Sequence, residues 1–405
     1  MALIVQKYGG SSVADAERIR NLARRIAVVK DRGDQVVAVV SAMGDTTDDL
    51  IKLAQQITNN PDEREMDMLL STGEIVSCTL MAMALKEIGY DAISLSGAQA
   101  GIMTTATYRN ARITAVDPKR VIQELREGKI VIVAGFQGIT DEMDVTTLGR
   151  GASDLTAIAL AAKLNGRCER YTDTEGVFTA DPRMVPDAQR IPEISYEEML
   201  EMATYGNKVI NPRAVELCEV YNVPMLVASS FNDKPGTLIH GGPFMEIRNK
   251  VRSIAHDLDV AKITVVGVPD QPGIAAAIFE PLAKAGISVD TIVQNASINN
   301  ITDLTFTIAR GHLAKAMEVV APIAKEIGAR ECVSDAKLGK VSVIGTGMQN
   351  APGYAARMFR TLSDKGINIQ LISTSEIRIT CIIEEAKVRE AVRALHKAFE
   401  LEKPE

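Results

Sequence analysis

The sequence predicts an N-terminal α/β domain with helices on both faces of a sheet, followed by two small α+β units. From residue 1 to about residue 240, apolar strand-like runs alternate with helical stretches, which is typical of a sheet covered by helices on both faces. Beyond residue 250 the sequence repeats itself with a period of about 80 residues, which indicates a duplicated domain rather than a solenoid.

Three strand-to-helix units support the N-terminal prediction. The run LIVQKY precedes a helix expected over Ala14 to Arg32, VVAVVSA precedes one over Thr47 to Ile57, and IVIVAGF precedes one over Leu155 to Leu164. Ligands of such sheets bind at the carboxyl ends of the strands, and the polar, glycine-rich turns of this chain fall there. We therefore expect a binding site formed by these turns.

Glycine and proline cluster in FNDKPGTLIHGGPF, Phe231 to Phe244, so we place a boundary near residues 240 to 250 and the first domain over 1–243. Beyond it VAKITVVGVPDQPG matches LGKVSVIGTGMQNAPG, and the expected domains are 250–330 and 331–405. Each copy reads as a ferredoxin-like unit that needs a fourth strand. No strand is expected after the last helix, so Arg252 to Asp257 is expected to cross over and complete the second copy.

Composition excludes several classes of function. The 405 residues carry a net charge of −7 and only 4% are aromatic, which argues against nucleic acid as a partner. The five cysteines are far apart and never at CxxC spacing, so neither a disulfide framework nor a metal site formed by a side-chain cluster is expected. We saw no apolar run of the ~18 residues needed for a membrane helix and no secretory signal, so we expect a cytoplasmic protein without a membrane partner.

The segment QKYGGSS occupies the first strand-to-helix turn. Its glycines, Gly9 and Gly10, let the backbone approach a phosphate, and Lys7 adds a positive charge. It is not a Walker A motif, because GxxxxGK[ST] occurs nowhere in the chain. An ordinary tight turn is an equally good interpretation of KYGG taken alone.

The segment TTLGRGASDLTA repeats the arrangement after another strand. Arg150 suits a clamp for a substrate carboxylate, and Asp154 suits the orientation of a cation or a metal. Ser153 or Asp154 would also serve as a helix N-cap, a role that is compatible with catalysis.

Three further segments are ambiguous by themselves. YTDTEGVFTADPRMVPDA is a turn-rich segment that suits a nucleotide but is also typical of a plain loop. Lys208 in GNKVINPRA reads as a solvated charge. Glu74 in STGE would either cap a helix dipole or pair with the ammonium group of a ligand.

Taken in order, KYGGSS, VVSAMGDTTDDL, STGE, TTLGRGASDLTA, YTDTEGVFTADPR and GNKVINPRA resemble the motif series of aspartate kinases of the amino acid kinase superfamily. The resemblance continues through both repeats, which look like ACT domains, and covers almost the whole chain. It implies a three-layer αβα amino acid kinase fold. It also implies ATP- and Mg²⁺-dependent phosphorylation of the L-aspartate side-chain carboxylate, the first step toward lysine, threonine, methionine and diaminopimelate.

The resemblance also implies roles for individual residues. Lys7, Asp154 and Lys208 are the expected catalytic residues, with Asp154 organising the two lysines or Mg²⁺. The expected ATP-binding residues are Lys7, Gly9, Gly10, Ser11, Asp173, Thr174, Thr179, Ala180, Asp181, Pro182, Arg183, Met184 and Lys208. The expected aspartate-binding residues are Ser41, Thr47, Glu74, Arg150, Gly151, Ala152 and Ser153.

The two repeats differ where an ACT domain binds an amino acid, since VPDQPG carries an acid that MQNAPG lacks. The family relation implies concerted inhibition by threonine and lysine at two unlike sites. Threonine is expected at Asp270, Ala275, Gln294 and Asn295, and lysine near Asn368, Ile369, Ser375 and Glu376. A homodimer or higher oligomer is expected, and an internal start near Met245 would give a separate regulatory subunit.

Two other classes of protein share some of these features. A kinase acting on glutamate, acetylglutamate or carbamate would have the KxGG loop and the fold, but usually not the ACT pair with the SAMGDTTDDL, STGE and RGASD combination. A non-catalytic amino-acid sensor would not need a phosphate site, so Lys7, Asp154 and Lys208 argue against it.

Overall fold

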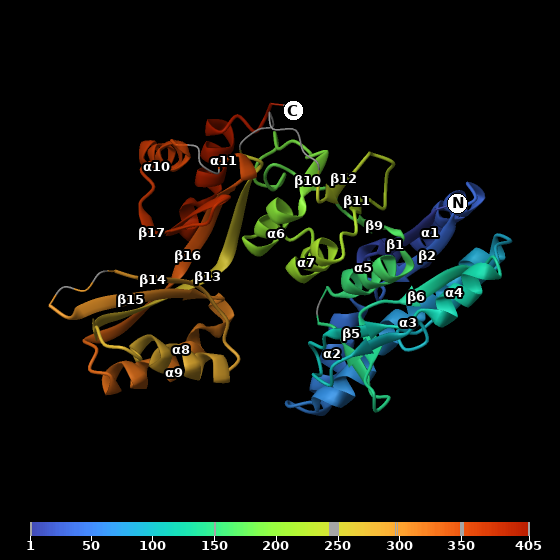
Figure 1. Ribbon diagram of the computed structural model, residues 1–405, viewed down its shortest axis with the longest axis horizontal. Helices are drawn as coiled ribbons and strands as arrows, with labels where there is room; N and C mark the ends of the chain where they lie inside the picture. Colours follow the sequence, from blue (N-terminus) through green and yellow to red (C-terminus); the bar gives the residue numbers. More distant parts are fainter. Residues whose placement is uncertain are drawn as a thin grey trace. The chain divides into compact units, whose positions relative to one another are not determined.

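A computed structural model describes residues 2–149, 151–242, 251–295, 297, 299–348 and 352–403. Arg150 and Met245 therefore lie outside the described residues. By its internal contacts the chain divides into two units (Figure 1). The first comprises Met1–Val177, Arg190–Thr204 and Lys208–Met245, and the second comprises Phe178–Gln189, Tyr205–Asn207 and Glu246–Glu405.

The first unit is built on an eight-stranded, mostly parallel sheet. Its central strands, such as QVVAVV and IVIVA, are nearly continuous apolar runs because a parallel sheet is buried on both faces. Only β11 and β12 run antiparallel to each other among the described pairs. The strand order is β10 (Glu193–Ser195), β12 (Thr237–His240), β11 (Met225–Ser229), β9 (Arg167–Thr172), β1 (Leu3–Tyr8), β2 (Gln35–Val40), β6 (Ile130–Ala134) and β3 (Ala92–Leu95).

Helices flank this sheet, as the sequence predicts. Ile26 and Met81, on the two longest helices of the unit, pack on one face in a core with Tyr8 and Val40. The three helices expected from the sequence are confirmed as α1, α2 and α5, with ends shifted by a few residues. The helices are α1 (Ala16–Asp31), α2 (Thr46–Ile57), α3 (Glu63–Glu87), α4 (Lys119–Arg126), α5 (Ser153–Leu164), α6 (Tyr196–Thr204) and α7 (Pro212–Val220).

A second, four-stranded sheet and a short 3₁₀ helix complete the first unit. The 3₁₀ helix η1 (Gly10–Val13) follows β1 directly. The small sheet has the order β5 (Ile113–Val116), β4 (Ile102–Thr104), β7 (Gln137–Ile139) and β8 (Val145–Thr147).

Helix α3 is the longest helix of the first unit. Among the described residues it is the one helix long and apolar enough to cross a membrane when length and composition alone are considered. Half of its most apolar window is buried within the protein, and Cys78, Met81 and Leu85 belong to the core under the central sheet. That is the position of a core helix, so its apolar character is explained by packing.

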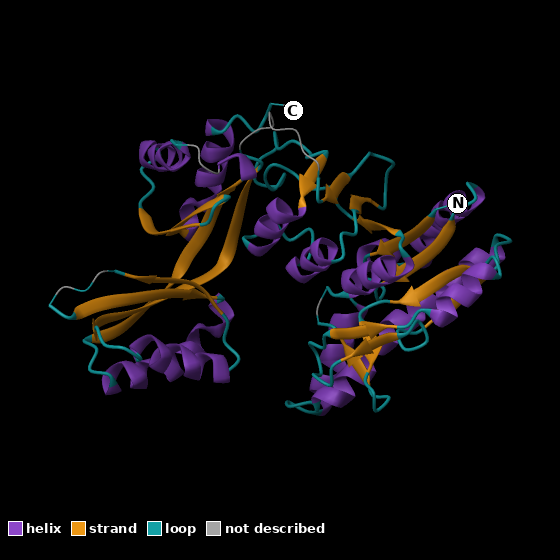
Figure 2. Cartoon of the chain, in the orientation of Figure 1, coloured by secondary structure: helices purple, strands orange, loops and turns teal. Residues whose placement is uncertain are grey.

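The second unit is built on one six-stranded sheet that both repeats share (Figure 2). Residues 253–257 pair with 340–344, which confirms that this segment supplies the fourth strand of the second repeat. Residues 331–335 pair with 262–266 and complete the first repeat in the same way. The order is β14 (Val289–Gln294), β15 (Ile301–Ile308), β13 (Ser253–Pro269), β16 (Glu331–Ile344), β18 (Arg378–Glu384) and β17 (Ile369–Thr374).

Each repeat covers its part of the sheet with two helices. Helices α8 (Ile274–Lys284) and α9 (Leu313–Glu326) lie against each other in the first repeat, and α10 (Tyr354–Asp364) and α11 (Val388–Ala398) do so in the second (Figure 1). Short 3₁₀ helices are η2 (Arg310–His312), η3 (Thr346–Met348) and η4 (Glu385–Lys387). Ala180 and Val185, from the N-terminal half of the sequence, are buried in the core of the second repeat.

Candidate active site

Three charged side chains, two of them buried and one largely buried, meet at the carboxyl ends of β1 and β9. Lys7 on β1 and Arg170 on β9 are direct partners in the strand pairing. Asp154, in the first turn of α5, contacts both cations: Lys7 Nζ forms an ion pair with Asp154 Oδ1 at 2.9 Å, and Arg170 Nε donates to Asp154 Oδ2 at 2.9 Å. The cluster therefore carries one net positive charge in a nearly dry environment.

The alternation of side chains along β1 places Lys7 in this cluster. Tyr8 points to the face covered by α1 and α3, where its ring stacks on Tyr171 at 5.2 Å. Because successive side chains of a strand point to opposite faces, Lys7 points to the other face, where α5 contacts β1 and β9. The residue is only 5% exposed.

Burial and neighbouring charges act together on the protonation of this cluster. Burial lowers the pKa of Lys7, and Arg170 lowers it further, while Asp154 opposes both effects. Burial would raise the pKa of Asp154, but Arg170 and Lys7 outweigh it and hold that pKa below its usual value. Asp154 is thus an anion that fixes two cations.

The glycine loop after β1 lies beside this cluster. A Cβ built on Gly9 would lie 3.8 Å from Lys7 Nζ, so any larger residue there would project over the ammonium group. The next residues form η1, whose first N–H groups have no partner inside the helix. Ser12 Oγ is bonded to Ser230 Oγ at 2.6 Å, which ties the loop to the end of β11. The geometry suits an anion held by backbone N–H groups beside a lysine.

A second polar group forms where α3 approaches the end of β2. Glu74 is 3% exposed, and its Oε1 accepts a hydrogen bond from Ala42 N at 3.1 Å. A Cβ on Gly73 would come within 2.9 Å of Ala42 Cβ, so the glycine allows this close approach. Glu74 Oε2 is buried and has no hydrogen-bond partner among the described residues. Burial raises the pKa of Glu74 to about 7.

Serines connect the Glu74 group to the start of α5. Ser41 Oγ donates to Ser153 Oγ at 3.0 Å, and Ser77 Oγ donates to the Ser41 carbonyl at 2.6 Å. The structure thus brings Ser41, Glu74 and Ser153 together, next to Asp154. Thr47 lies in the first turn of α2, half-buried. Gly151 and Ala152 immediately precede α5, and Arg150 is outside the described residues.

The other residues expected to bind ATP fall in two places. Asp173 and Thr174 directly follow β9, so they share the strand end with Arg170. Asp173 is exposed, and Thr174 Oγ1 is buried without a hydrogen-bond partner among the described residues. Residues 179–184 belong to the second unit.

Lys208 is a solvated charge, as its own motif indicates, whereas Arg170 was not expected at the site from the sequence. Lys208 lies in the turn between α6 and α7, is exposed, and makes no ion pair within the described part of the chain. Arg170 is the second cation bonded to Asp154, and the sequence analysis missed it. In the sequence, Arg170 is only a charged residue in a strand that ends at a polar turn. The pairing of β9 with β1 is what brings it next to Lys7.

The positions expected to bind effectors are exposed in both repeats, except for Ile369, which is half-buried. Asp270 and Ala275 flank the start of α8, and Gln294 and Asn295 lie at the end of β14. In the second repeat, Asn368 and Ile369 lie at the start of β17, while Ser375 and Glu376 follow its end. A six-residue strand spans about 20 Å, so one amino acid cannot touch both ends within one chain.

Comparison with known families defines the class of protein. The model of the amino acid kinase family matches residues 2–229, and a model of the ACT domain matches residues 263–321 and 341–399. The fold and the Lys7 cluster therefore belong to an amino acid kinase that carries two ACT domains.

Known relatives narrow this class. The chain is 52% identical to an aspartokinase of Mycolicibacterium smegmatis over 99% of this chain and 97% of the relative, and 50% identical to that of Corynebacterium glutamicum over 99% and 97%. A crystal structure of aspartate kinase from Synechocystis matches 98% of this chain and 70% of that chain, with 44% identity and a TM-score of 0.55. The chain belongs to the aspartokinase family and is an aspartate kinase.

The fold is shared with a more distant solved structure. E. coli aspartokinase III in complex with aspartate and ADP superposes with a TM-score of 0.79 over 98% of this chain and 99% of that chain, at 24% identity.

Proposed function

We propose that this aspartate kinase transfers the γ-phosphoryl group of ATP to the side-chain carboxylate of L-aspartate through the site around Lys7, giving 4-phospho-L-aspartate and ADP. One observation carries the proposal: the buried Lys7–Asp154–Arg170 cluster at a strand end, beside a glycine loop. A carboxylate oxygen of aspartate attacks the γ-phosphorus, and the bond to the bridging oxygen of ADP breaks. No proton has to be removed from the nucleophile, so catalysis rests on positioning and charge neutralisation.

In this mechanism Lys7 neutralises charge that develops on the transferred phosphoryl group. Asp154 holds the Lys7 ammonium in place from one side, and Arg170 holds Asp154 from the other. A fixed ammonium costs no reorganisation when the charge develops, which is the source of its catalytic effect. Lys208, exposed on its turn, is proposed to approach the phosphates from a second side.

The group around Glu74 is proposed to bind aspartate. Glu74 Oε2, buried and without a described partner, would accept from the substrate ammonium. Ser41 and Ser153 are held together next to it and would hydrogen-bond the substrate, with Thr47, Gly151 and Ala152 lining the same pocket. Arg150 is proposed to take the α-carboxylate, a bidentate contact.

Mg²⁺ is proposed to arrive with the nucleotide. Within the described ranges no three His, Cys, Asp or Glu side chains lie close enough to form a metal site. Both oxygens of Asp154 already face cations. This fits a metal that is bound mainly by phosphates and water, as Mg²⁺ commonly is, and when bound it supplies further charge neutralisation.

Asp173, Thr174 and residues 179–184 are proposed to contact adenosine. Thr174 Oγ1, buried and unpaired among the described residues, supports this for the first pair. Residues 179–184 follow within a few positions along the chain, in a turn-rich segment.

The ACT domains are proposed to bind threonine at the first repeat and lysine at the second, and to inhibit in concert. The difference between Asp270 and its counterpart in the second copy supports two unlike sites. E. coli aspartokinase III has been solved in complex with lysine and aspartate. We further propose a cytoplasmic homodimer or higher oligomer acting in lysine, threonine, methionine and diaminopimelate synthesis, with a regulatory subunit started near Met245.

The proposal is tested by ATP-dependent formation of aspartyl hydroxamate by the purified full chain, with glutamate and acetylglutamate as alternative substrates. We expect activity with aspartate alone and strong inhibition only when threonine and lysine are both present. Turnover of glutamate or acetylglutamate in preference to aspartate would refute the substrate assignment. Activity that neither amino acid affects would refute the regulatory one.

A further inference from the structure

The segment Phe178–Gln189 belongs structurally to the second ACT domain, although it lies within the kinase family match. Ala180 and Val185 are buried in one core cluster with Val392 and Leu395 of α11. The Thr179 carbonyl accepts a hydrogen bond from Ile254 N at 2.8 Å, at the edge strand that completes this domain. The segment is therefore packed as part of the regulatory fold.

A buried polar contact fixes the start of this segment. Thr179 Oγ1 lies 2.9 Å from His396 Nε2, and it also accepts a hydrogen bond from Gln189 N at 2.9 Å. Thr179 N donates to the Gln189 carbonyl at 2.9 Å, so the two ends of the segment are joined. Thr179 and His396 are 8% and 2% exposed. Both of these contacts of the Thr179 side chain are made within the second unit.

Two arginines fix the turn at the middle of the segment. Arg389 Nη2 donates to the Arg183 carbonyl at 3.1 Å, and Arg393 Nε donates to the Met184 carbonyl at 2.7 Å. They are four residues apart on α11, so they lie on one face of the helix and reach two successive carbonyls. Within the turn, Asp181 pairs with Arg183 at 2.8 Å.

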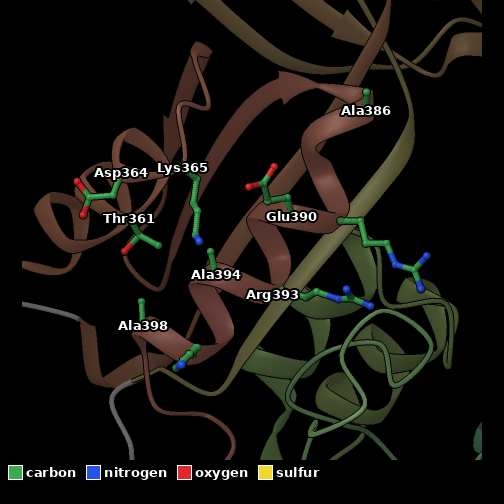
Figure 3. A pocket seen from close by; sticks show the side chains of 10 residues that line it. Thr361, Asp364, Lys365, Ala386, Glu390, Arg393, Ala394 and Ala398 are labelled. Atoms are coloured by element: carbon green, nitrogen blue, oxygen red, sulfur yellow. The ribbon is translucent and has the colours of Figure 1, made fainter.

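Figure 3 shows the groove that lies between α10 and α11. Lys365 and Glu390 point into that groove, whereas the Arg393 side chain extends away from it. Arg389 and Arg393 line its rim, and each donates a hydrogen bond to a carbonyl group of residues 178–189. Lys397 also lines the groove, and no hydrogen bond joins its side chain to residues 178–189.

We infer that α11 of the second ACT domain sets the conformation of the nucleotide-binding segment, with Arg389, Arg393 and His396 as positioning residues for the phosphoryl donor. They act through residues 179–184 without touching ATP. The inference rests on the proposed assignment of those residues to adenosine.

The test compares the full-length enzyme with the double variant Arg389→Gln/Arg393→Gln in steady-state kinetics without effectors. We expect the KM for ATP to rise about three- to ten-fold, as for the loss of charged hydrogen bonds, while the KM for aspartate stays within about two-fold. Lys397→Gln removes one positive charge from the same helix and is expected to change neither constant. A variant with unchanged KM for ATP, or with both KM values raised equally, would overturn the inference.

Hydrogen exchange of the peptide 178–189 separates this inference from the proposal on which it rests. In the wild type, ADP is expected to slow its exchange, and failure to do so would show that the segment does not bind nucleotide. In the double variant without nucleotide, exchange is expected to be faster than in the wild type. If ADP protects the peptide but the double variant exchanges like the wild type, the segment binds nucleotide and the arginines do not position it.

Discussion

Lys7 and Asp154 form an ion pair of 2.9 Å between side chains that are only 7% and 3% exposed. Two charges at this depth lose most of their hydration, and Arg170 offsets part of that cost by a further contact to the carboxylate. The free-energy cost of burying these charges is consistent with a catalytic role. A lysine held in a fixed, buried position strongly stabilises negative charge that develops on a phosphoryl group.

Asp154→Asn is expected to lower kcat about a hundred-fold or more, because Lys7 loses the anion that fixes it. It should also lower the free energy of unfolding by about 3–5 kcal/mol, since two cations are left without their buried partner. Steady-state kinetics and denaturant unfolding measure the two effects.

Asp67→Asn is the control for this variant. Asp67 is equally buried but accepts hydrogen bonds from Arg109 N, Thr147 N and Thr147 Oγ1. We expect a loss of stability with kcat within about three-fold of the wild type. Equal kcat values for the two variants would contradict the role given to Asp154.

Aspartate binding is expected to depend on pH through Glu74. Its raised pKa of about 7 means that the carboxylate is increasingly protonated below that pH. Because a substrate ammonium group prefers the anion, kcat/KM for aspartate at saturating ATP should fall as pH decreases through about 7. Glu74→Gln should have a lower kcat/KM at pH 8 and a flatter profile; an unchanged profile would remove Glu74 from the substrate site.

Glu74 is also expected to lower the stability of the folded protein at alkaline pH. The pKa of Glu74 is higher in the folded state than in the unfolded chain, so its contribution to stability is fully present below the unfolded value and is lost as pH rises through about 7. Glu74→Gln is therefore expected to have a higher Tm than the wild type at pH 8, with the difference shrinking toward pH 5. Thermal unfolding across this range measures it, and a Tm below that of the wild type at pH 8 would contradict the assignment.

Gly73→Ala tests the close approach of α3 to the β2 end. The added Cβ would meet Ala42 Cβ at 2.9 Å, so we expect a loss of about 1–3 kcal/mol and a higher KM for aspartate as Glu74 is displaced. Gly311→Ala is the matched control, because a Cβ there has no atom within 4 Å and its φ is not positive. Similar losses of stability in both variants would show that the packing of Gly73 is not special.

Asp270→Asn tests the effector proposal. An acid at this position would take the ammonium group of threonine, so the variant should need at least about ten-fold more threonine for inhibition while kcat stays unchanged. Glu280→Gln removes an exposed acid from α8 of the same repeat and should not alter inhibition. Normal threonine inhibition in Asp270→Asn would place the effector elsewhere.

The sequence by itself determined the features that depend on local pattern and on internal repetition. The α/β alternation, the two ferredoxin-like repeats and the crossing of residues 253–257 to the second repeat all follow from runs of apolar residues, turn residues and the count of strands in each copy. Lys7, Asp154, Ser41 and Ser153 were also recognisable, because each stands in a motif at the end of a strand or the start of a helix. Glu74 was recognisable from its motif too, although the structure places it in the middle of α3.

Only the tertiary structure decided which distant segments become neighbours. Arg170 joined the site because β9 pairs with β1, and strand order is chosen by long-range packing that leaves no local signature. Lys208, whose own motif indicates a solvated charge, lies exposed on its turn. Residues 178–189 joined the second ACT domain because Ala180 and Val185 complete its core and α11 supplies donors for its carbonyls. Burial and hydrogen bonding between segments far apart in the sequence determine such pairings.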